Sequence, residues 1–238
     1  MSSHSRPAAD RIVSTLRAIF GHRLHSVVAY GAPVENGGAE SGERFACLAL
    51  VSNVTMADLE ASAAHASDWT RHHIATPLLL PEDEFRRSFD AFPLEYAEIL
   101  RAHEVLFGAN PFDGIAIDRG DLRRACETQI KSHLVHLREA FIEAGGTPRA
   151  IADLVMASAP AFGALLRNIA RLNGSAERDR AMATREGARA AELPEALVTG
   201  ILALERPSGL KAVDAARLFP EYLAAVERLA RYVDHWRA

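Results

Sequence analysis

Cysteine is scarce in the sequence, and long apolar runs are absent. The 238 residues include two cysteines, Cys47 and Cys126, which are too few for a disulfide framework and lack the spacing of a zinc site. No apolar run approaches the roughly 20 residues that span a bilayer, and the N-terminal MSSHSRPAADR lacks the apolar segment of a signal peptide. These absences predict a cytoplasmic protein with no membrane partner, whose two thiols are free and buried.

Lysine is also scarce, because Lys131 and Lys211 are the only two and all other basic residues are arginines. Up to Gly114 the sequence has 9 arginines and 15 acidic residues, a net charge of −6, whereas the remainder has a net charge of +2. Neither part carries the strong positive charge that is typical of nucleic-acid-binding proteins. The composition therefore gives no strong nucleic-acid signal.

The first half of the sequence alternates between strand and helix patterns. Apolar residues at helical spacing predict a helix over residues 6–20, and the β-rich LHSVVAY predicts a strand over 24–30. This alternation is typical of a small α/β domain, which we place at residues 1–114. Further strands are expected at 45–51, 73–80 and 92–100, and further helices at 55–71 and 81–88.

The second half has helical patterns only, so residues 115–238 are predicted to form an all-α helical bundle. A long helix is expected between Asp118 and Gly145, and Thr147-Pro148 has the chemistry of a new helix start. The apolar stripe of the last helix fits either the core of the bundle or a homodimer surface. Further helices are expected at 148–158, 160–172, 176–190, 194–204 and 211–236.

One segment has the form of a phosphate- and metal-binding turn. Residues 29–51 read AYGAPVENGGAESGERFACLALV, which is a strand end with a glycine, a glycine-containing loop and a second strand. In the nucleotidyltransferase fold, such a glycine turn lets backbone N–H groups approach a triphosphate. Two acids two residues apart on the second strand face the same way and hold divalent metal, and a third acid on a neighbouring strand completes the site.

The sequence resembles a bacterial nucleotidyltransferase-domain family beyond this turn. The segment PLLLPEDEFRRSFDAFPLEYAEILRAHEVLFGANPF is similar to the later strands of that family. The segments DLRRACETQIKSHLVHLREAFIEAGG and SAPAFGALLRNIARLNG are similar to its helical domain. The resemblance implies an α/β or α+β domain with a mixed sheet and flanking helices, followed by a helical bundle, and it implies a nucleotide as ligand.

The departures from the family pattern fall where the chemistry belongs. Gly31 stands at the glycine position, but Ala32 replaces the serine whose hydroxyl meets phosphate. Phe45 and Cys47 stand where the two metal-binding aspartates belong, and neither a phenyl ring nor a soft thiol replaces a carboxylate for Mg²⁺. Of the expected acids only Glu95, at the third position, remains as a catalytic candidate. No metal site and no cofactor are therefore predicted.

Two rearranged metal sites stay open as alternatives. Glu95 paired with a loop glutamate such as Glu43 would hold Mg²⁺, although loop carboxylates are usually only solvated. His133, His136 and Glu139 can share one helix face at a spacing that suits zinc, but no fourth ligand is evident and core or interfacial histidines are the favoured interpretation.

Arg123 and Arg124 are candidates for binding the phosphates of a nucleotide. They belong to a basic cluster on the helix expected after Asp118. The alternative is a solvated helix face whose arginines pair with Glu127 and Glu139.

Three functions fit these observations. The first is a nucleotidyltransferase-fold protein that lacks metal-dependent transferase activity and binds a nucleotide or a protein partner. The second is an active nucleotidyltransferase with a relocated metal site. The third is an antitoxin-like or structural homo-oligomer whose cleft is vestigial.

Overall fold

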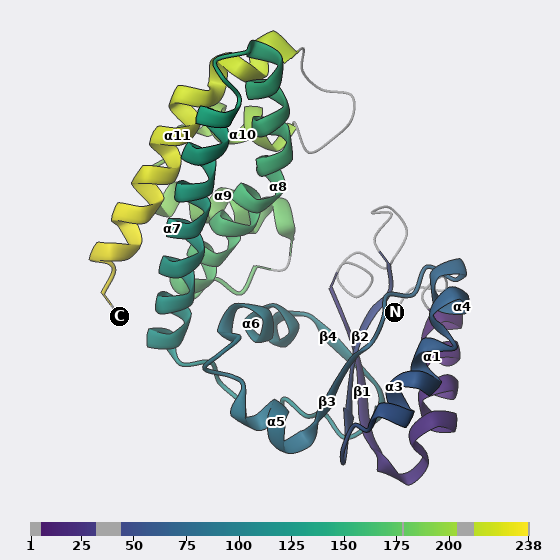
Figure 1. Cartoon of the computed structure of the whole chain (residues 1–238). Coiled ribbons are helices and arrows are strands. Elements are labelled where there is room, and N and C mark those ends of the chain that lie inside the picture. Colours follow the sequence, from purple (N-terminus) through teal and green to yellow (C-terminus); the bar gives the residue numbers. More distant parts are fainter. Residues whose placement is uncertain (1–5, 32–43, 178, 204–211, 238) are drawn as a thin grey trace. The chain divides into compact units, whose positions relative to one another are not determined.

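The computed structural model describes residues 6–31, 44–177, 179–203 and 212–237 (Figure 1). The chain divides into two compact units, Met1–Ile117 and Asp118–Ala238. The division thus falls after Ile117, whereas the sequence patterns placed it after Gly114. Each unit is described by itself below.

Unit 1 contains a four-stranded mixed sheet, which confirms the predicted fold class. The strands are β1 (Leu24–Tyr30), β2 (Ala46–Val51), β3 (Leu78–Pro81) and β4 (His103–Gly108), in the order β3-β2-β1-β4. β1 is antiparallel to both β2 and β4, and β3 is parallel to β2. β1 therefore lies inside the sheet, and β4 forms one edge.

Helices cover both faces of this sheet (Figure 1). On one face, Ile12 and Leu16 of α1 and Trp69 of α4 pack against Val27 and Ala29 of β1. On the other face, Phe85 of α5 and Tyr96 and Ile99 of α6 pack against Val28 and Leu48. The elements are α1 (Arg6–Phe20), the 3₁₀ helix η1 (Gly21–Arg23), α3 (Met56–Ala63), α4 (Ala66–Arg71), α5 (Glu82–Arg87) and α6 (Pro93–Arg101).

The strand predicted over residues 92–100 is wrong, because this segment is helix α6. Pro93 occupies the first turn, where its missing N–H costs nothing, Glu95 lies near the positive helix start and Arg101 near the negative helix end. The strand that completes the sheet, β4, begins two residues after this helix at His103.

Unit 2 is an all-α bundle built around one long helix, α8 (Pro148–Leu172). This helix contacts α7 (Arg119–Glu143), α9 (Arg180–Ala190), α10 (Glu195–Ala203) and α11 (Ala212–His235). By length and composition α8 could cross a membrane, since its most apolar window has a mean hydropathy of 1.4. Twelve of its residues are buried, which fits the central helix of a bundle.

The helix break predicted at Pro160 is also wrong, because α8 continues through this residue. A proline inside a helix removes one backbone N–H donor and disturbs the preceding turn. Two hydroxyl groups donate hydrogen bonds to carbonyls in that turn: Ser158 Oγ to Val155 O at 3.2 Å and Tyr222 Oη to Ser158 O at 3.4 Å. Pro160 is thus accommodated inside a continuous helix, and Tyr222 of α11 contacts this part of it.

Candidate functional site

The site predicted from the sequence begins at the end of β1, where Gly31 turns the chain. Its φ angle of +81° lies in the left-handed region, and no atom lies within 4 Å of the position that a Cβ would take. Backbone conformation, not space, therefore requires glycine here. Ala32 and Glu43 lie outside the described residues.

Strand pairing brings three residues into one row beside this turn. Ala29 of β1 pairs with Cys47 of β2 on one side and with Glu104 of β4 on the other. Directly paired residues of neighbouring strands project to the same face of a sheet. Cys47, Ala29 and Glu104 therefore share the face that α1 and α4 cover.

The two positions expected to hold metal are buried in an apolar core. Phe45 is 4% exposed and Cys47 is 1% exposed, and both belong to the core formed with α1 and α4. Burial raises the pKa of the Cys47 thiol to about 12, so the sulfur is neutral at physiological pH. A phenyl ring and a neutral thiol in this core do not fit Mg²⁺, which prefers charged oxygen ligands.

This mismatch does not depend on the alignment register. Among the residues of the four described strands, Glu104 is the only acidic one, so a shift along β2 brings no carboxylate to the site. Within the described part of the chain, no group of three or more His, Cys, Asp and Glu side chains could hold a metal ion.

Glu95 does not occupy the strand position for which it was chosen. It lies in the first turn of α6 and its side chain is exposed. The acid that lies on a strand next to β1 is Glu104, which the sequence reading missed. The signal for this strand is the apolar run VLF, bounded by Gly108.

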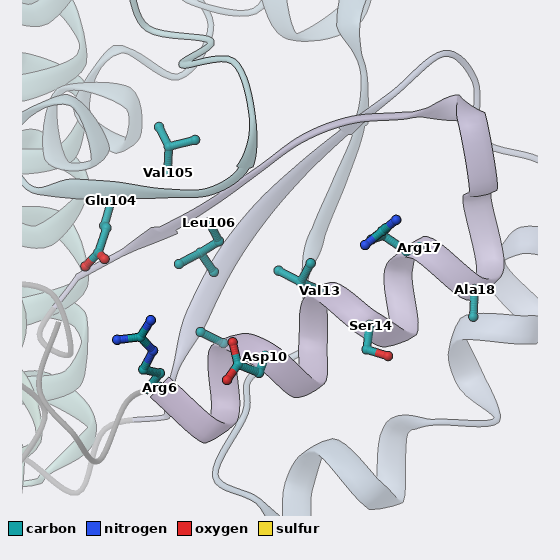
Figure 2. Close-up of a pocket in the computed structure, with 10 residues that line it drawn as sticks. Arg6, Asp10, Val13, Ser14, Arg17, Ala18, Glu104, Val105 and Leu106 are labelled. Atoms are coloured by element: carbon teal, nitrogen blue, oxygen red, sulfur yellow. The ribbon is translucent and has the colours of Figure 1, made fainter.

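Glu104 also lines a cavity between α1 and the edge strand β4 (Figure 2). The cavity has a volume of about 960 Å³, within the range of small-molecule sites. Its polar lining includes both signs of charge, and its apolar lining comes from both elements. The lining residues are Arg6, Ala9, Asp10, Val13, Ser14, Arg17, Ala18, Glu104, Val105 and Leu106.

The phosphate-binding candidates of unit 2 are paired with acids of their own helix. Arg123 lies 3.3 Å from Glu127, and Arg124 forms an ion pair with Asp121. Lys131 also contacts Glu127, at 2.5 Å. These contacts favour the solvated, paired helix face that the sequence left as the alternative.

The three residues considered for zinc do not converge. His133 Nε2 lies 2.9 Å from Tyr222 Oη, at the packing surface with α11. His136 pairs instead with Glu139 at 3.0 Å, on the exposed side of the helix. Burial, and then the nearby His136, lowers the pKa of His133. His133 is therefore an interfacial histidine.

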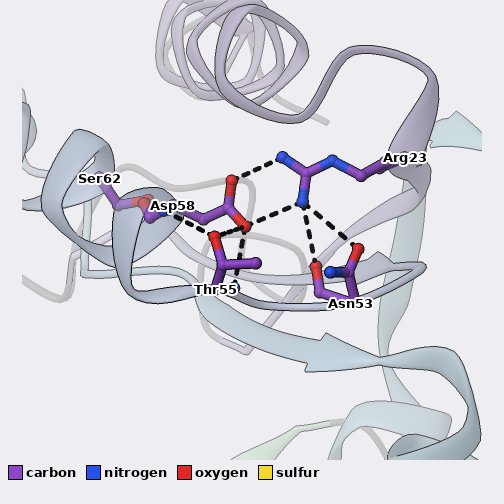
Figure 3. Close-up of polar contacts among 5 residues, drawn as sticks. All are labelled: Arg23, Asn53, Thr55, Asp58 and Ser62. Carbon is purple, nitrogen blue, oxygen red and sulfur yellow. Dashed lines mark hydrogen bonds and ion pairs between the residues drawn. The ribbon is translucent and has the colours of Figure 1, made fainter.

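A second polar cluster joins Asp58, in the first turn of α3, to Arg23, which directly precedes β1 (Figure 3). Both carboxylate oxygens of Asp58 accept from Arg23, at 2.8 and 2.6 Å. Thr55 and Asp58 form a capping box at the start of α3, and Ser62 Oγ donates to the Asp58 carbonyl at 2.8 Å. The Arg23 hydrogen bonds, followed by that of Thr55, hold the pKa of Asp58 far below its usual value.

This cluster satisfies its own polar groups. Arg23 and Asp58 form a bidentate pair whose side chains are 27% and 7% exposed, and the remaining contacts cap a helix. We assign it a structural role, in tying α3 to the start of β1.

Comparison with solved structures supports the fold. The structure of the spectinomycin adenyltransferase AAD(9) from Enterococcus faecialis with ATP and spectinomycin matches with a TM-score of 0.63 and 11% sequence identity. The match covers 94% of this chain and 98% of that chain. Neither a family model nor a curated protein sequence matches. The fold is therefore nucleotidyltransferase-like, with a helical second unit.

Proposed function

We propose that the chain is a nucleotidyltransferase-fold protein that binds a nucleotide and does not catalyse metal-dependent nucleotidyl transfer. The observation that carries this proposal is the burial of Phe45 and Cys47 where the fold family holds metal. Metal ions contribute several kcal/mol of transition-state stabilisation to phosphoryl transfer, and a strand without carboxylates cannot supply their ligands.

Two observations support nucleotide binding. The glycine turn at Gly31 remains, and such a turn suits the approach of backbone N–H groups to phosphate. The similar adenyltransferase was solved with ATP. Arg123 and Arg124, whose side chains are 27% and 69% exposed, are the candidates for phosphate contacts. A phosphate would have to displace Glu127 or Asp121 from them.

The test is calorimetric titration with ATP and GTP, each with Mg²⁺ and with a chelator. The proposal expects affinities that agree within about twofold in the two conditions, since no metal bridges protein and phosphate. Arg124→Gln should weaken ATP binding several-fold, whereas the control Arg149→Gln, at another exposed arginine of unit 2, should not. Binding that requires Mg²⁺ would contradict the proposal.

The active-transferase alternative keeps one supporting observation, the position of Glu104 beside Ala29. It predicts Mg²⁺-dependent release of pyrophosphate from ATP, abolished by Glu104→Gln or, for the relocated site first considered, by Glu95→Ala. If the protein has no affinity for either nucleotide, the antitoxin-like or structural homo-oligomer becomes the better proposal.

A further inference from the structure

Three polar side chains meet at the start of β1, which is the end of this strand opposite the Gly31 turn. His25 Nε2 lies 2.9 Å from Ser52 Oγ, and His25 Nδ1 lies 2.8 Å from Glu82 Oε2. A hydroxyl, an imidazole and a carboxylate in this order form the chain of hydrogen bonds that activates a serine for attack on a carbonyl group. The residues are far apart in the sequence, so the fold brings them together.

The sheet brings Ser52 and Glu82 to the same place. β2 and β3 are parallel, and Val51 of β2 pairs with Pro81 of β3. Ser52 and Glu82 directly follow this pair, so both leave the sheet at the carboxyl end of the two strands. The N–H of Ser52 donates to Arg23 O at 2.9 Å, which fixes Ser52 beside the start of β1.

A β-bulge turns His25 toward these two residues. The register of the two strands shifts between Leu24 and Ser26 of β1, because these residues pair with consecutive residues of β2. His25 is therefore the extra residue of the bulge, and it is exposed, whereas both of its neighbours in β1 are buried. Bulges re-aim side chains and are frequent next to active sites.

The hydrogen bonds also set the tautomer of His25. Arg86 donates to Glu82 Oε1 at 2.8 Å, and this contact, followed by that of His25, lowers the pKa of Glu82. Glu82 is therefore an ionised carboxylate, which only accepts hydrogen bonds. Nδ1 of a neutral His25 then carries the proton, and Nε2 presents its lone pair to the Ser52 hydroxyl. This is the state in which Nε2 can take the hydroxyl proton.

The three groups are accessible to a small substrate. The side chains of His25 and Glu82 are each 40% exposed, and Ser52 is exposed. The next residue, Asn53, is held by Arg23, which donates to its carbonyl and side-chain oxygens at 3.4 Å each. In the described part of the chain the Asn53 N–H has no hydrogen-bond partner, so it is available to a developing oxyanion.

We propose that Ser52, His25 and Glu82 form an esterase-type site for small activated esters, with Ser52 as nucleophile, His25 as general base and acid, and Glu82 as positioning residue. Ser52 Oγ bonds to the carbonyl carbon and its proton moves to His25 Nε2; the ester C–O bond then breaks and the alkoxide takes this proton. Water next attacks the acyl-serine, and His25 passes a proton from the water to the departing Ser52 Oγ. The products are a carboxylic acid and an alcohol.

The site goes beyond the proposed nucleotide binding and does not depend on it, because the two share no residue. The openness of the site implies selection by reactivity, so we expect short acyl groups with good leaving groups as substrates.

The experiment treats the full-length protein with diisopropyl fluorophosphate, which bonds to activated serines and releases hydrogen fluoride. The proposal expects an adduct on the peptide that contains Ser52, detected by mass spectrometry. His25→Gln should slow this labelling at least about 100-fold, the effect of removing a general base. His72→Gln should not slow it, and His72 is a matched control because its side chain is 41% exposed, against 40% for His25.

Hydrolysis of 4-nitrophenyl acetate gives a second readout. Ser52→Ala should lower the rate at least about tenfold, whereas Ser14→Ala, at an exposed serine of α1, should not. Glu82→Gln should also lower the rate about tenfold, because His25 shifts from the Nδ1–H toward the Nε2–H tautomer. The ¹⁵N chemical shifts of the imidazole report this change of tautomer, which a purely structural role of Glu82 does not predict.

Thermal unfolding of each variant checks that the fold is intact, and labelling of the wild type needs no variant. Three results would overturn the proposal: no adduct at Ser52, equally fast labelling of folded His25→Gln, or an ester hydrolysis rate that Ser52→Ala leaves unchanged.

Discussion

The two ends of β1 differ in their surroundings, which are polar at the start and apolar at the end. At its start, Arg23 and Asp58 form a bidentate ion pair, and His25 contacts both Glu82 and Ser52. At its end, the neighbouring position on β2 is Cys47, inside an apolar core. Among the described residues of unit 1, the polar contacts at the start of β1 fix helices to the sheet, whereas the β2 position beside its end is filled by a buried thiol.

This difference distinguishes interactions that stabilise the fold from side chains that only a metal-dependent reaction requires. An ion pair with a capping box stabilises α3 whatever ligand the protein binds. Two metal-binding carboxylates repel one another without their metal, so a protein that no longer uses the metal gains stability by replacing them with apolar residues. Phe45 and Cys47 contribute to the core that α1 and α4 complete, as the proposed function requires.

The largest effect is expected from putting an acid back at the end of β1. Cys47→Asp places a carboxylate at a position that is 1% exposed, without a partner, and should destabilise unit 1 by about 3–5 kcal/mol. Cys47→Ala, which only removes the sulfur, should cost about 1 kcal/mol. Urea unfolding followed by the fluorescence of Trp69, in a Trp236→Phe background, measures both.

An equal cost for the two Cys47 variants would break the comparison between the ends of β1. It would show that a carboxylate at this position reaches water or a cation. The position would then belong to an open cleft, and the metal-free reading of the site would fail.

A smaller effect distinguishes two glycines, one near each end of β1. Gly108 of β4 lies opposite Ser26, with φ +77°, and an added Cβ would lie 1.9 Å from the carbonyl oxygen of His25. Gly31 has a similar φ angle but open space around it. Gly108→Ala should therefore cost about 3 kcal/mol, from strain and overlap together, and Gly31→Ala about 1 kcal/mol, from strain alone.

The same unfolding assay measures these two variants, and nucleotide titration adds a second readout. If Gly31→Ala leaves stability nearly unchanged but abolishes ATP binding, the turn is used for binding. Equal destabilisation by the two substitutions would mean that the end of β1 is packed as tightly as its start.

Much of this architecture could be predicted from the sequence, because the patterns are local. LHSVVAY and FACLALV predict β1 and β2, and the apolar stripe after Asp118 predicts α7. The segment FPLEYAEIL has aromatic and aliphatic residues that suit either a strand or a helix, whereas Pro93 and the charges at its two ends favour the helix that forms. Pro160 is a helix-breaking residue by local propensity, but α8 continues through it within the bundle.

The sequence predicts a candidate site only where a family motif can be matched. The sequence alone places Gly31, Phe45 and Cys47 by resemblance. The row formed by Cys47, Ala29 and Glu104 needs the pairing of three strands, and the cavity needs α1 beside β4. Contacts between residues this far apart in the sequence leave no periodic pattern to read.

The smallest expected effect concerns the pH dependence of stability at the start of β1. Hydrogen bonds from Arg23 hold the folded pKa of Asp58 below its unfolded value of about 3.9, so the folded state releases this proton more readily. The resulting stabilisation is complete above about pH 5 and is lost as the pH falls toward the folded pKa. Asp58→Asn removes the titrating group, so stability should fall less steeply between pH 5 and about pH 3 than in the wild type. Urea unfolding at these pH values measures the slope, and Asp83→Asn, at an exposed position of α5, is the control. Equal slopes for the wild type and Asp58→Asn would mean that the ion pair at the start of β1 contributes no more to stability than a surface pair does.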